Sequence, residues 1–312
     1  MYRFLTPSPL NHFRLLLVVV GFILLPHVSR AQKDIVFISD TQAPMWVEKL
    51  VLGSNHNIQA TKMVFSDIIL HRPGSLFILG DVVTLGYKKK KWITMDAYLD
   101  SCRKAGIQVT ALLGNHDVMT KSRKGETQFQ KRFPDHNKTG YYRVVDSVAI
   151  VFLNSNFRKL SPDEFDHQQA WLHTTLQSLD NDAAVVTTLV TCHHAPYSNS
   201  KIVGSSKNVQ EHFVPEFLQS KKARLFITGH SHNYEHFKYE GKDFLVIGGG
   251  GGLSQPVSKK EKGYDDLSSS YKPQFHYLVL RRHGSAITLT SRFLKSDFSG
   301  FEEGLSFSIP IR

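Results

Sequence analysis

The chain contains only two cysteines in 312 residues, Cys102 and Cys192, which excludes a small scaffold held together by disulfides. Glycine (21) and proline (12) are not enriched and 41% of the residues are hydrophobic, so collagen-like and disordered chains are excluded as well. The composition describes a globular protein whose length allows one large domain or two ordinary ones. Cys102 falls in a helical pattern and Cys192 ends an apolar strand, so we expect two separate core residues.

Acidic residues are in the minority, with 27 Asp and Glu against 38 Lys and Arg, a formal net charge of +11. Arg3, Arg14 and Arg30 lie in an amino-terminal segment, and a chain without these three charges would be nearer +8. A basic surface attracts anions of any kind and does not identify a partner. The 16 histidines are more informative, because imidazole is both a metal ligand and a proton carrier near neutral pH.

Residues 1–31 have the pattern of a secretory signal peptide. Arg3 and Arg14 precede an apolar run from Leu15 to Pro26, and Ser29-Arg30-Ala31 places small residues at alternate positions. The run of about 12 residues is shorter than the roughly 20 that span a bilayer. We therefore expect cleavage after Ala31 and a secreted or periplasmic protein. An uncleaved membrane anchor is the alternative.

Short apolar runs and helical patterns alternate along residues 32–312, which we interpret as a single domain. Buried strands are expected at 35–39, 75–79, 108–113, 184–191, 225–228 and 244–247, and helices at 58–71, 92–105, 162–179 and 209–220. Three hairpins are expected at 141–153, 234–247 and 274–293. The alternation predicts an α/β fold, with either one mixed sheet or two sheets face to face and helices outside. Residues 248–252 and 254–270 are typical of surface loop.

Polar side chains follow five of the predicted strands at the point where each strand ends. These strand ends carry Asp40-Thr41-Gln42, Gly80-Asp81, Gly114-Asn115-His116-Asp117, His193-His194-Ala195-Pro196 and Gly229-His230-Ser231-His232. The carboxyl ends of neighbouring parallel strands meet at one edge of a sheet, so we expect these groups to converge.

A mixed set of oxygen and imidazole donors suits Zn, Mn or Fe better than Mg or Ca. The donors exceed the demand of one tetrahedral ion, and two divalent ions account for them. Two such ions stabilise both the attacking and the leaving oxygen in displacement at phosphorus. Asp81 is the natural candidate for a carboxylate that bridges the pair.

The five motifs, in this order, resemble those of the calcineurin-like metallophosphoesterase superfamily, and the resemblance covers essentially the whole chain after residue 31. The stretches from His194 to Ser200 and from Gly229 to Glu235 look similar to the secreted purple acid phosphatase branch. The resemblance implies a four-layer α/β/β/α sandwich around a dimetal centre. It implies that Asp40, Gln42 and His232 hold one ion, that Asp81 bridges, and that Asn115, His194 and His230 hold the other.

The resemblance also implies that His116 acts as general acid or transition-state stabiliser, with Asp117 orienting His116 or its loop. Two positions depart from the pattern of the family. Gln42 stands where most members have histidine, and its neutral oxygen is a weaker ligand. Thr84 stands where the purple enzymes have the tyrosine that gives their colour, so a purple ferric enzyme is not expected.

Adjacent side chains of a strand point to opposite faces, so His193 and His194 cannot both face the metals. The spacing to Pro196 favours His194 over His193. The run Lys88–Lys91 is interpreted as a solvated helix start, with guidance of phosphate towards the site as the alternative.

The sequence thus predicts an exported, dimetal-dependent hydrolase of phosphate monoesters that uses metal-activated water. A phosphodiesterase or nucleotide pyrophosphatase on the same site is one alternative, and a catalytically weak binding protein of the same fold is the other. The expected partner is a phosphorylated small molecule, not nucleic acid. No stable membrane anchoring is expected once the leader is cleaved, and the oligomeric state is left open.

Overall fold

The structure is a computed structural model that describes residues 33–53, 56–258, 264–268 and 274–311. The expected signal peptide lies outside these residues, as does part of the predicted loop at 254–270. In the described ranges, no helix has the length and apolar character needed to cross a bilayer.

The first sheet has six strands in the order β12-β11-β10-β1-β2-β3. Its strands are β1 (Ile35–Ile38), β2 (Ser75–Ile78), β3 (Gln108–Ala111), β10 (His276–His283), β11 (Ala286–Leu294) and β12 (Phe301–Pro310). Strands β1, β2 and β3 run parallel, whereas β10 pairs antiparallel with β1 and the last three strands form a meander. The carboxyl ends of β1, β2 and β3 therefore lie at one edge of this sheet.

The second sheet has six strands in the order β4-β5-β6-β7-β9-β8. Its strands are β4 (Tyr141–Val145), β5 (Val148–Phe152), β6 (Thr187–Thr191), β7 (Ala223–Thr228), β8 (Tyr234–Tyr239) and β9 (Lys242–Ile247). The central strands β5, β6, β7 and β9 are parallel, and β4 and β8 close the two edges as hairpin partners. Both sheets are thus mixed, as predicted.

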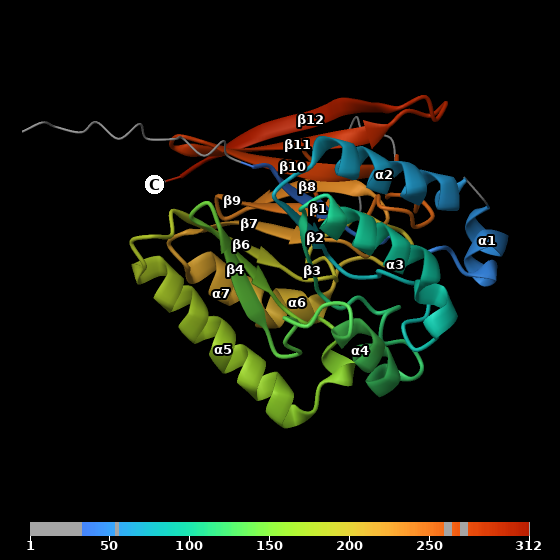
Figure 1. Ribbon diagram of the computed structural model, residues 1–312. Coiled ribbons are helices and arrows are strands. Elements are labelled where there is room, and N and C mark those ends of the chain that lie inside the picture. Colours follow the sequence, from blue (N-terminus) through green and yellow to red (C-terminus); the bar gives the residue numbers. More distant parts are fainter. Residues whose placement is uncertain (1–32, 54–55, 259–263, 269–273, 312) are drawn as a thin grey trace, which may run out of the picture. The chain divides into compact units, whose positions relative to one another are not determined.

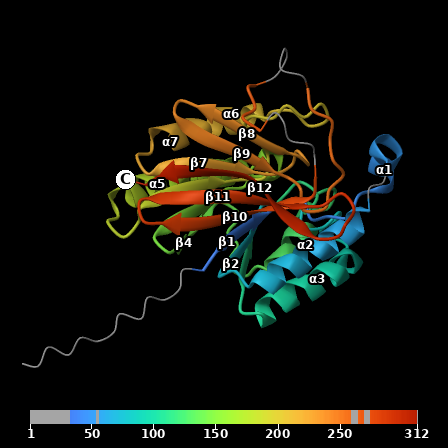
Figure 2. The same cartoon turned by 90° about the horizontal axis from the view of Figure 1, so that it is seen from above.

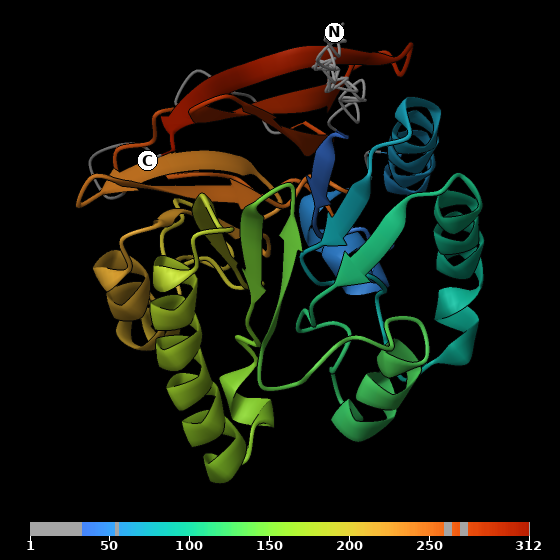
Figure 3. The same ribbon diagram turned by 60° about the vertical axis from the view of Figure 1, so that its left-hand side comes forward.

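Helices cover the outer faces of both sheets (Figures 1 and 3). They are α1 (Trp46–Leu52), α2 (Asn57–His71), α3 (Lys89–Lys104), α4 (Ser122–Gln130), α5 (Pro162–Asn181), α6 (Lys207–His212) and α7 (Val214–Gln219), with a 3-10 turn at Phe157–Lys159. Helices α2 and α3 pack on the first sheet, and α5, α6 and α7 pack on the second. Viewed from above, the two sheets lie face to face (Figure 2).

The alternation of side chains along β1 shows how the sequence builds these layers. Val36 and Ile38 point outward into the core beneath α2 and α3, whereas Ile35 and Phe37 point into the core between the sheets. Successive side chains of a strand face opposite sides, and both sides are apolar because both faces of the sheet are covered. The predicted four-layer α/β/β/α arrangement is confirmed.

The predicted elements are present with small changes at their ends. Ser161 caps α5 and Glu164 completes the capping box, as its sequence predicts. The single helix expected at 209–220 is wrong, because the chain forms α6 and α7 with Phe213 between them and Pro215 in the first turn of α7. Cys102 and Cys192 are both buried and free. Helices α1 and α4 and strand β12 were not predicted.

Aromatic rings join the two sheets through the central core. Phe77 on β2 lies 5.4 Å from Phe37 and 5.3 Å from Phe152 on β5 between ring centroids, and Tyr141 stacks on Phe152 at 4.8 Å. Phe77 is 2% exposed. This side chain therefore connects strands that are far apart in the sequence.

We expect Phe77→Ala to lower the free energy of unfolding by about 3–5 kcal/mol, because the cavity lies where the sheets cannot close without moving. Urea denaturation followed by circular dichroism measures the change. Ile93→Ala on α3, where the side chain is 67% exposed, is the control and should cost less than about 1 kcal/mol. Equal costs for the two variants would contradict this account of the core.

Candidate metal centre

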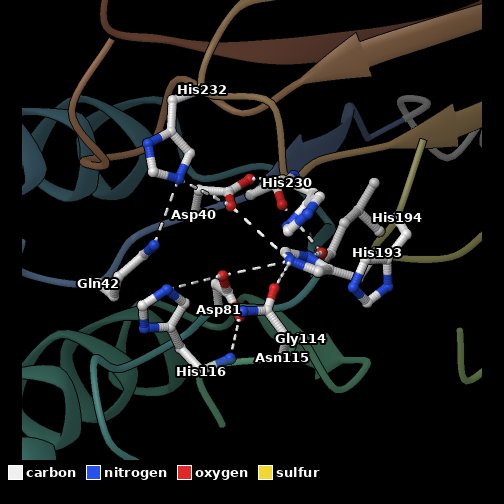
Figure 4. Close-up of polar contacts among 12 residues, drawn as sticks. Asp40, Gln42, Asp81, Gly114, Asn115, His116, His193, His194, His230 and His232 are labelled. Atoms are coloured by element: carbon white, nitrogen blue, oxygen red, sulfur yellow. Dashed lines mark hydrogen bonds and ion pairs between the residues drawn. The ribbon is translucent and has the colours of Figure 1, made fainter. Parts of the chain in front are cut away.

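Segments that follow five parallel strands bring the predicted donors to one edge between the sheets (Figure 4). In the first sheet, β1 leads to Asp40 and Gln42, β2 to Asp81, and β3 to Asn115 and His116. In the second sheet, β6 leads to His193 and His194, and β7 leads to His230 and His232. Parallel strands share the direction of their carboxyl ends, so groups far apart in the chain meet here. The predicted convergence is therefore present.

Asp81, His193 and His230 form the tightest group of possible metal ligands among the described residues. One donor atom from each lies within 4.8 Å of the others. The Nε2 atom of His193 lies 3.2 Å from Oδ2 of Asp81, 3.1 Å from Oδ1 of Asn115 and 4.0 Å from Oδ1 of Asp40. Nε2 of His193 therefore stands among three side-chain oxygens at the centre of the site.

His194 points elsewhere, although the spacing to Pro196 favoured it as the ligand. Its Nδ1 lies 2.8 Å from the hydroxyl of Ser155, and its ring packs on His230 with centroids 4.4 Å apart. The structure thus brings His193, and not His194, against the carboxylates (Figure 4). This placement differs from the sequence preference for His194, because β6 ends at Thr191 and the orientation of the two rings is set in the turn beyond it.

Asp40 and His232 face each other on the other side of Asp81. Oδ2 of Asp40 accepts a hydrogen bond from the main-chain N–H of His230 at 2.9 Å, and Oδ1 lies 3.4 Å from Nε2 of His232. Within the described part of the chain this Oδ1 is buried and accepts no hydrogen bond. Nδ1 of His232 lies 2.7 Å from the carbonyl of Leu253, which leaves Nε2 with its lone pair towards Asp40.

The amide of Gln42 can turn its oxygen to the same point. In the orientation that satisfies both amide atoms, Nε2 donates to the main-chain carbonyls of Asp81 at 3.0 Å and Asp40 at 3.2 Å. Oε1 then occupies the position 3.4 Å from Nε2 of His232. The side chain is 1% exposed, so the oxygen is held inside the site and available to a cation.

His116 lies at the rim of the donor group. Its main-chain N–H donates to Oδ1 of Asp81 at 2.8 Å, and its Nδ1 lies 3.1 Å from the carbonyl of Thr84. Nε2 is left 3.9 Å from Oδ2 of Asp81 and 3.9 Å from Oε1 of Glu48 on α1. The ring is therefore oriented by Thr84 with Nε2 directed into the site.

Asp117 contacts main-chain groups and not the ring of His116. Its carboxylate accepts hydrogen bonds from the N–H groups of Val82 at 3.3 Å, Val83 at 3.2 Å and Gly114 at 2.9 Å. Burial, together with the charge of Asp81, raises the pKa of Asp117 to about 7. Asp117 thus joins the loop after β2 to the loop after β3, and of the two roles that the resemblance implies, the geometry favours orientation of the loop.

Opposite electrostatic effects act on the central groups. Burial opposes the charge on Asp81, but His193 and the neighbouring imidazoles outweigh burial and lower its pKa. Burial also disfavours the charged form of His193, yet Asp81 raises the pKa of His193 to about 9. Burial lowers the pKa of His194 to about 3 and lowers that of His230 well below its usual value. The carboxylates therefore attract a cation, while His230 keeps a free lone pair.

Three of the site residues adopt left-handed backbone conformations. The φ angles are 59° at Asp40, 50° at Asp81 and 69° at His230. Residues other than glycine occupy this region rarely, and strain of this kind collects at functional sites. The main-chain N–H of Asp40 donates to the carbonyl of Gly80 at 3.1 Å, so the two strained turns support each other.

The glycine run 248–252 is part of the site and not the surface loop that was expected. The N–H of Gly250 donates to Ser39 at 2.9 Å and the N–H of Gly252 donates to Asp40 at 2.8 Å. A Cβ on Gly252 would lie 2.5 Å from the His232 ring. The segment is buried, because only a chain without side chains can pass this close behind the ligand loops.

Glu235 is a supporting residue that the sequence analysis missed. It is fully buried on β8 and accepts hydrogen bonds from the hydroxyls of Ser198 at 2.8 Å and Ser231 at 2.7 Å, and from the N–H of Asn199 at 2.5 Å. It thereby joins the loop after β6 to the loop after β7. Only the two serines and the asparagine, which are polar residues at strand ends, signal such a partner in the sequence.

The donor chemistry fits divalent metal ions. Two carboxylates, two amide oxygens and three imidazoles converge, and a buried carboxylate oxygen of Asp40 has no hydrogen-bond donor in the described chain. A buried charged oxygen without a partner is costly unless a cation neutralises it. Imidazole with carboxylate oxygen is the ligand type of Zn, Mn and Fe.

Solved structures with the same fold include several phosphatases. The chain is similar to a purple acid phosphatase from yellow lupin (Lupinus luteus) seeds, with a TM-score of 0.67 and 18% identity over 89% of this chain and 53% of the lupin chain. It is similar to GAP50 of Plasmodium, with a TM-score of 0.63 and 16% identity over 90% of this chain and 89% of that one. A dimetal phosphatase from Danio rerio gives a TM-score of 0.54 and 12% identity over 90% and 99%.

These identities show likeness of fold alone, and this chain spans about half of the length of the lupin protein. No curated protein matches the sequence. The sequence profile described as calcineurin-like phosphoesterase matches residues 33–234, which include the segments of all five strand ends. The chain therefore belongs to the calcineurin-like phosphoesterase family.

Proposed function

We propose that this protein is an exported hydrolase of phosphate monoesters that works with two divalent metal ions. The observation that carries the proposal is the position of Asp81, whose carboxylate lies between two groups of donors. Asp40, Gln42 and His232 lie on one side, and Asn115, His193 and His230 lie on the other. A carboxylate in this place is suited to bridge two cations.

The side chains of the site would have three different roles: metal binding, proton donation and support of the loops. The two groups of donors would hold one ion each, and the ions would supply charge neutralisation at the phosphoryl oxygens and hydroxide near neutral pH. His116 would donate a proton to the leaving oxygen from Nε2, because the Thr84 carbonyl fixes the other ring nitrogen. Asp117 would hold the loop that carries His116, and Glu235 would hold the two loops that carry His193 and His230.

The proposal on export is supported by the pattern of residues 1–31 alone. Identification of Gln32 as the amino-terminal residue of the protein recovered from the medium or periplasm would support cleavage after Ala31. The preference for monoesters is tested by comparing p-nitrophenyl phosphate with bis-p-nitrophenyl phosphate. Faster hydrolysis of the diester would favour the phosphodiesterase alternative on the same site.

A binding protein of the same fold is the second candidate, because Gln42 offers a neutral oxygen where a stronger ligand is common. Metal content and turnover measured on the same sample distinguish this binding protein from the hydrolase. Bound metal without hydrolysis of either ester would favour the binding protein.

We expect a chelator to abolish hydrolysis of p-nitrophenyl phosphate and added Mn, Zn or Fe to restore it, because the donors of this site fit these ions. Asp81→Asn should lose metal and activity together, since it removes the charge between the two groups of donors. Elemental analysis and initial rates measure both. Full activity of Asp81→Asn, or activity in excess chelator, would contradict the proposed centre.

Substitution of the adjacent histidines tests which of them is a ligand. His193→Ala should lower the metal content and reduce kcat by roughly 100-fold or more, because it removes the imidazole beside Asp81 and Asn115. His194→Ala is the matched control and should keep its metal, with Tm recorded for both variants since His193 is buried and His194 is half-buried. Loss of metal from His194→Ala alone would assign the ligand to His194.

The proposed role of His116 predicts a separation of metal binding from turnover. His116→Ala should keep its metal while kcat falls by roughly 100-fold or more, because a proton donor is lost and no ligand is removed. The loss should be smaller for an ester whose leaving group has a low pKa, which needs less protonation. An unchanged kcat on phenyl phosphate would show that His116 has no part in the chemistry.

A further inference from the structure

Helix α1 presents its apolar side to solvent. Trp46, Val47, Leu50 and Val51 have exposed fractions of 75%, 44%, 74% and 73%, and none of the seven residues of the helix is buried. At about 100° per residue these four side chains occupy one continuous arc of about 140°. The helix lies at the periphery of the fold (Figures 1 and 2).

The opposite side of α1 carries an acid and faces the metal centre. Oε1 of Glu48 lies 3.9 Å from Nε2 of His116, and the side chain is 22% exposed. Amphipathic helices normally bury the apolar face, so the orientation of α1 is reversed. An isolated helix of seven residues is not stable in water, and an exposed apolar patch beside an active site indicates something that covers it.

Exposed lysines lie on α1 and on the neighbouring helices α2 and α3. Lys49 lies on α1, Lys62 on α2, and Lys90 and Lys91 in the first turn of α3. They line two adjoining cavities of about 410 and 270 Å³ that share Ile58 and Tyr98. Across the described ranges none of the four forms an ion pair, and the first turns of α2 and α3 contain no acidic residue. The positive charge here is therefore free to attract an anionic partner.

We propose that α1 and these lysines form a docking surface for anionic lipid membranes, which brings the rim of the metal centre at His116 near the lipid surface. Tryptophan and leucine on one arc with lysines nearby is the composition of an interfacial helix, which enters the headgroup region without spanning the bilayer. The net charge of the chain, +11 with residues 1–31 and nearer +8 without their three arginines, adds attraction at longer range. Binding through this surface would be peripheral and reversible, which agrees with the expectation of no stable membrane anchoring.

The size of the apolar arc favours a membrane over a second copy of the chain. A helix of seven residues is about 10 Å long, whereas a stable protein interface needs roughly 800 Å² on each partner. Insertion of a few apolar side chains into a bilayer needs no matching surface. The inference rests on exposure and charge, and it does not require metal binding or turnover.

Vesicle binding tests the proposal with a matched pair of variants. Purified protein is sedimented with vesicles of phosphatidylcholine alone and with vesicles that contain about one third phosphatidylglycerol, at low and high salt. We expect tighter binding to the anionic vesicles, weakened by salt, and a blue shift of the Trp46 fluorescence, read as the difference from Trp46→Phe. Any contribution of the amino-terminal segment is the same in every variant.

Leu50→Gln/Val51→Gln should weaken vesicle binding by roughly tenfold or more, because two exposed apolar groups no longer enter the lipid. Leu70→Gln, at the far end of α2 and 76% exposed, should bind as the unsubstituted protein does. Both variants should keep Tm and the hydrolysis of soluble esters. Equal binding of both variants, or no preference for anionic vesicles, would overturn the proposal, as would a dimer seen by sedimentation that Leu50→Gln/Val51→Gln abolishes.

Discussion

The structure depends on the burial of negative charge at the edge where the two sheets meet. Asp40 and Asp81 are almost without solvent contact, and their backbones are held in conformations that such residues seldom adopt. Burial of ionised carboxylates is unfavourable unless cations or hydrogen bonds compensate it. The imidazoles, the main-chain donors of the loops and the close-packed glycine run supply part of that compensation. A cation held by the proposed ligands would complete it, and the stability of this edge and its chemistry would then have the same origin.

The layers of the fold were predictable because they follow from the pattern of apolar residues within each strand and helix. Strands with apolar residues on both faces need cover on both sides, and the sequence alternates such strands with amphipathic helices. The convergence of Asp40 with Asp81 followed from one further rule, that neighbouring parallel strands end at the same edge of a sheet. The approach of His230, which follows β7, also requires that the two sheets lie face to face. None of these steps needed knowledge of side-chain orientation. Strand β12 escaped prediction because its exposed, serine-containing sequence gains its strand conformation only by pairing with β11.

The predictions that differ from the structure concern segments beyond the ends of the strands. His193 and His194 are chemically identical neighbours, and the rule of alternating faces stops applying where β6 ends at Thr191. The glycine run was read as loop because glycine commonly marks a turn, whereas Gly250 and Gly252 here allow the backbone to pass against Ser39 and His232. The hydrogen bonds of this run to Ser39 and Asp40 join segments some 200 residues apart, so no local pattern records them.

Helix α1 has one side exposed to solvent and the other beside the metal centre. Glu48 can approach His116 only if the helix turns its acidic side inward, and on a helix that rotation necessarily turns Trp46 and Leu50 outward. The exposed apolar arc is thus coupled to the position of a carboxylate at the rim of the metal centre. An environment that accepts the arc would favour the same rotation. Docking at a lipid surface and placement of Glu48 would then stabilise each other, because both use one orientation of one short helix.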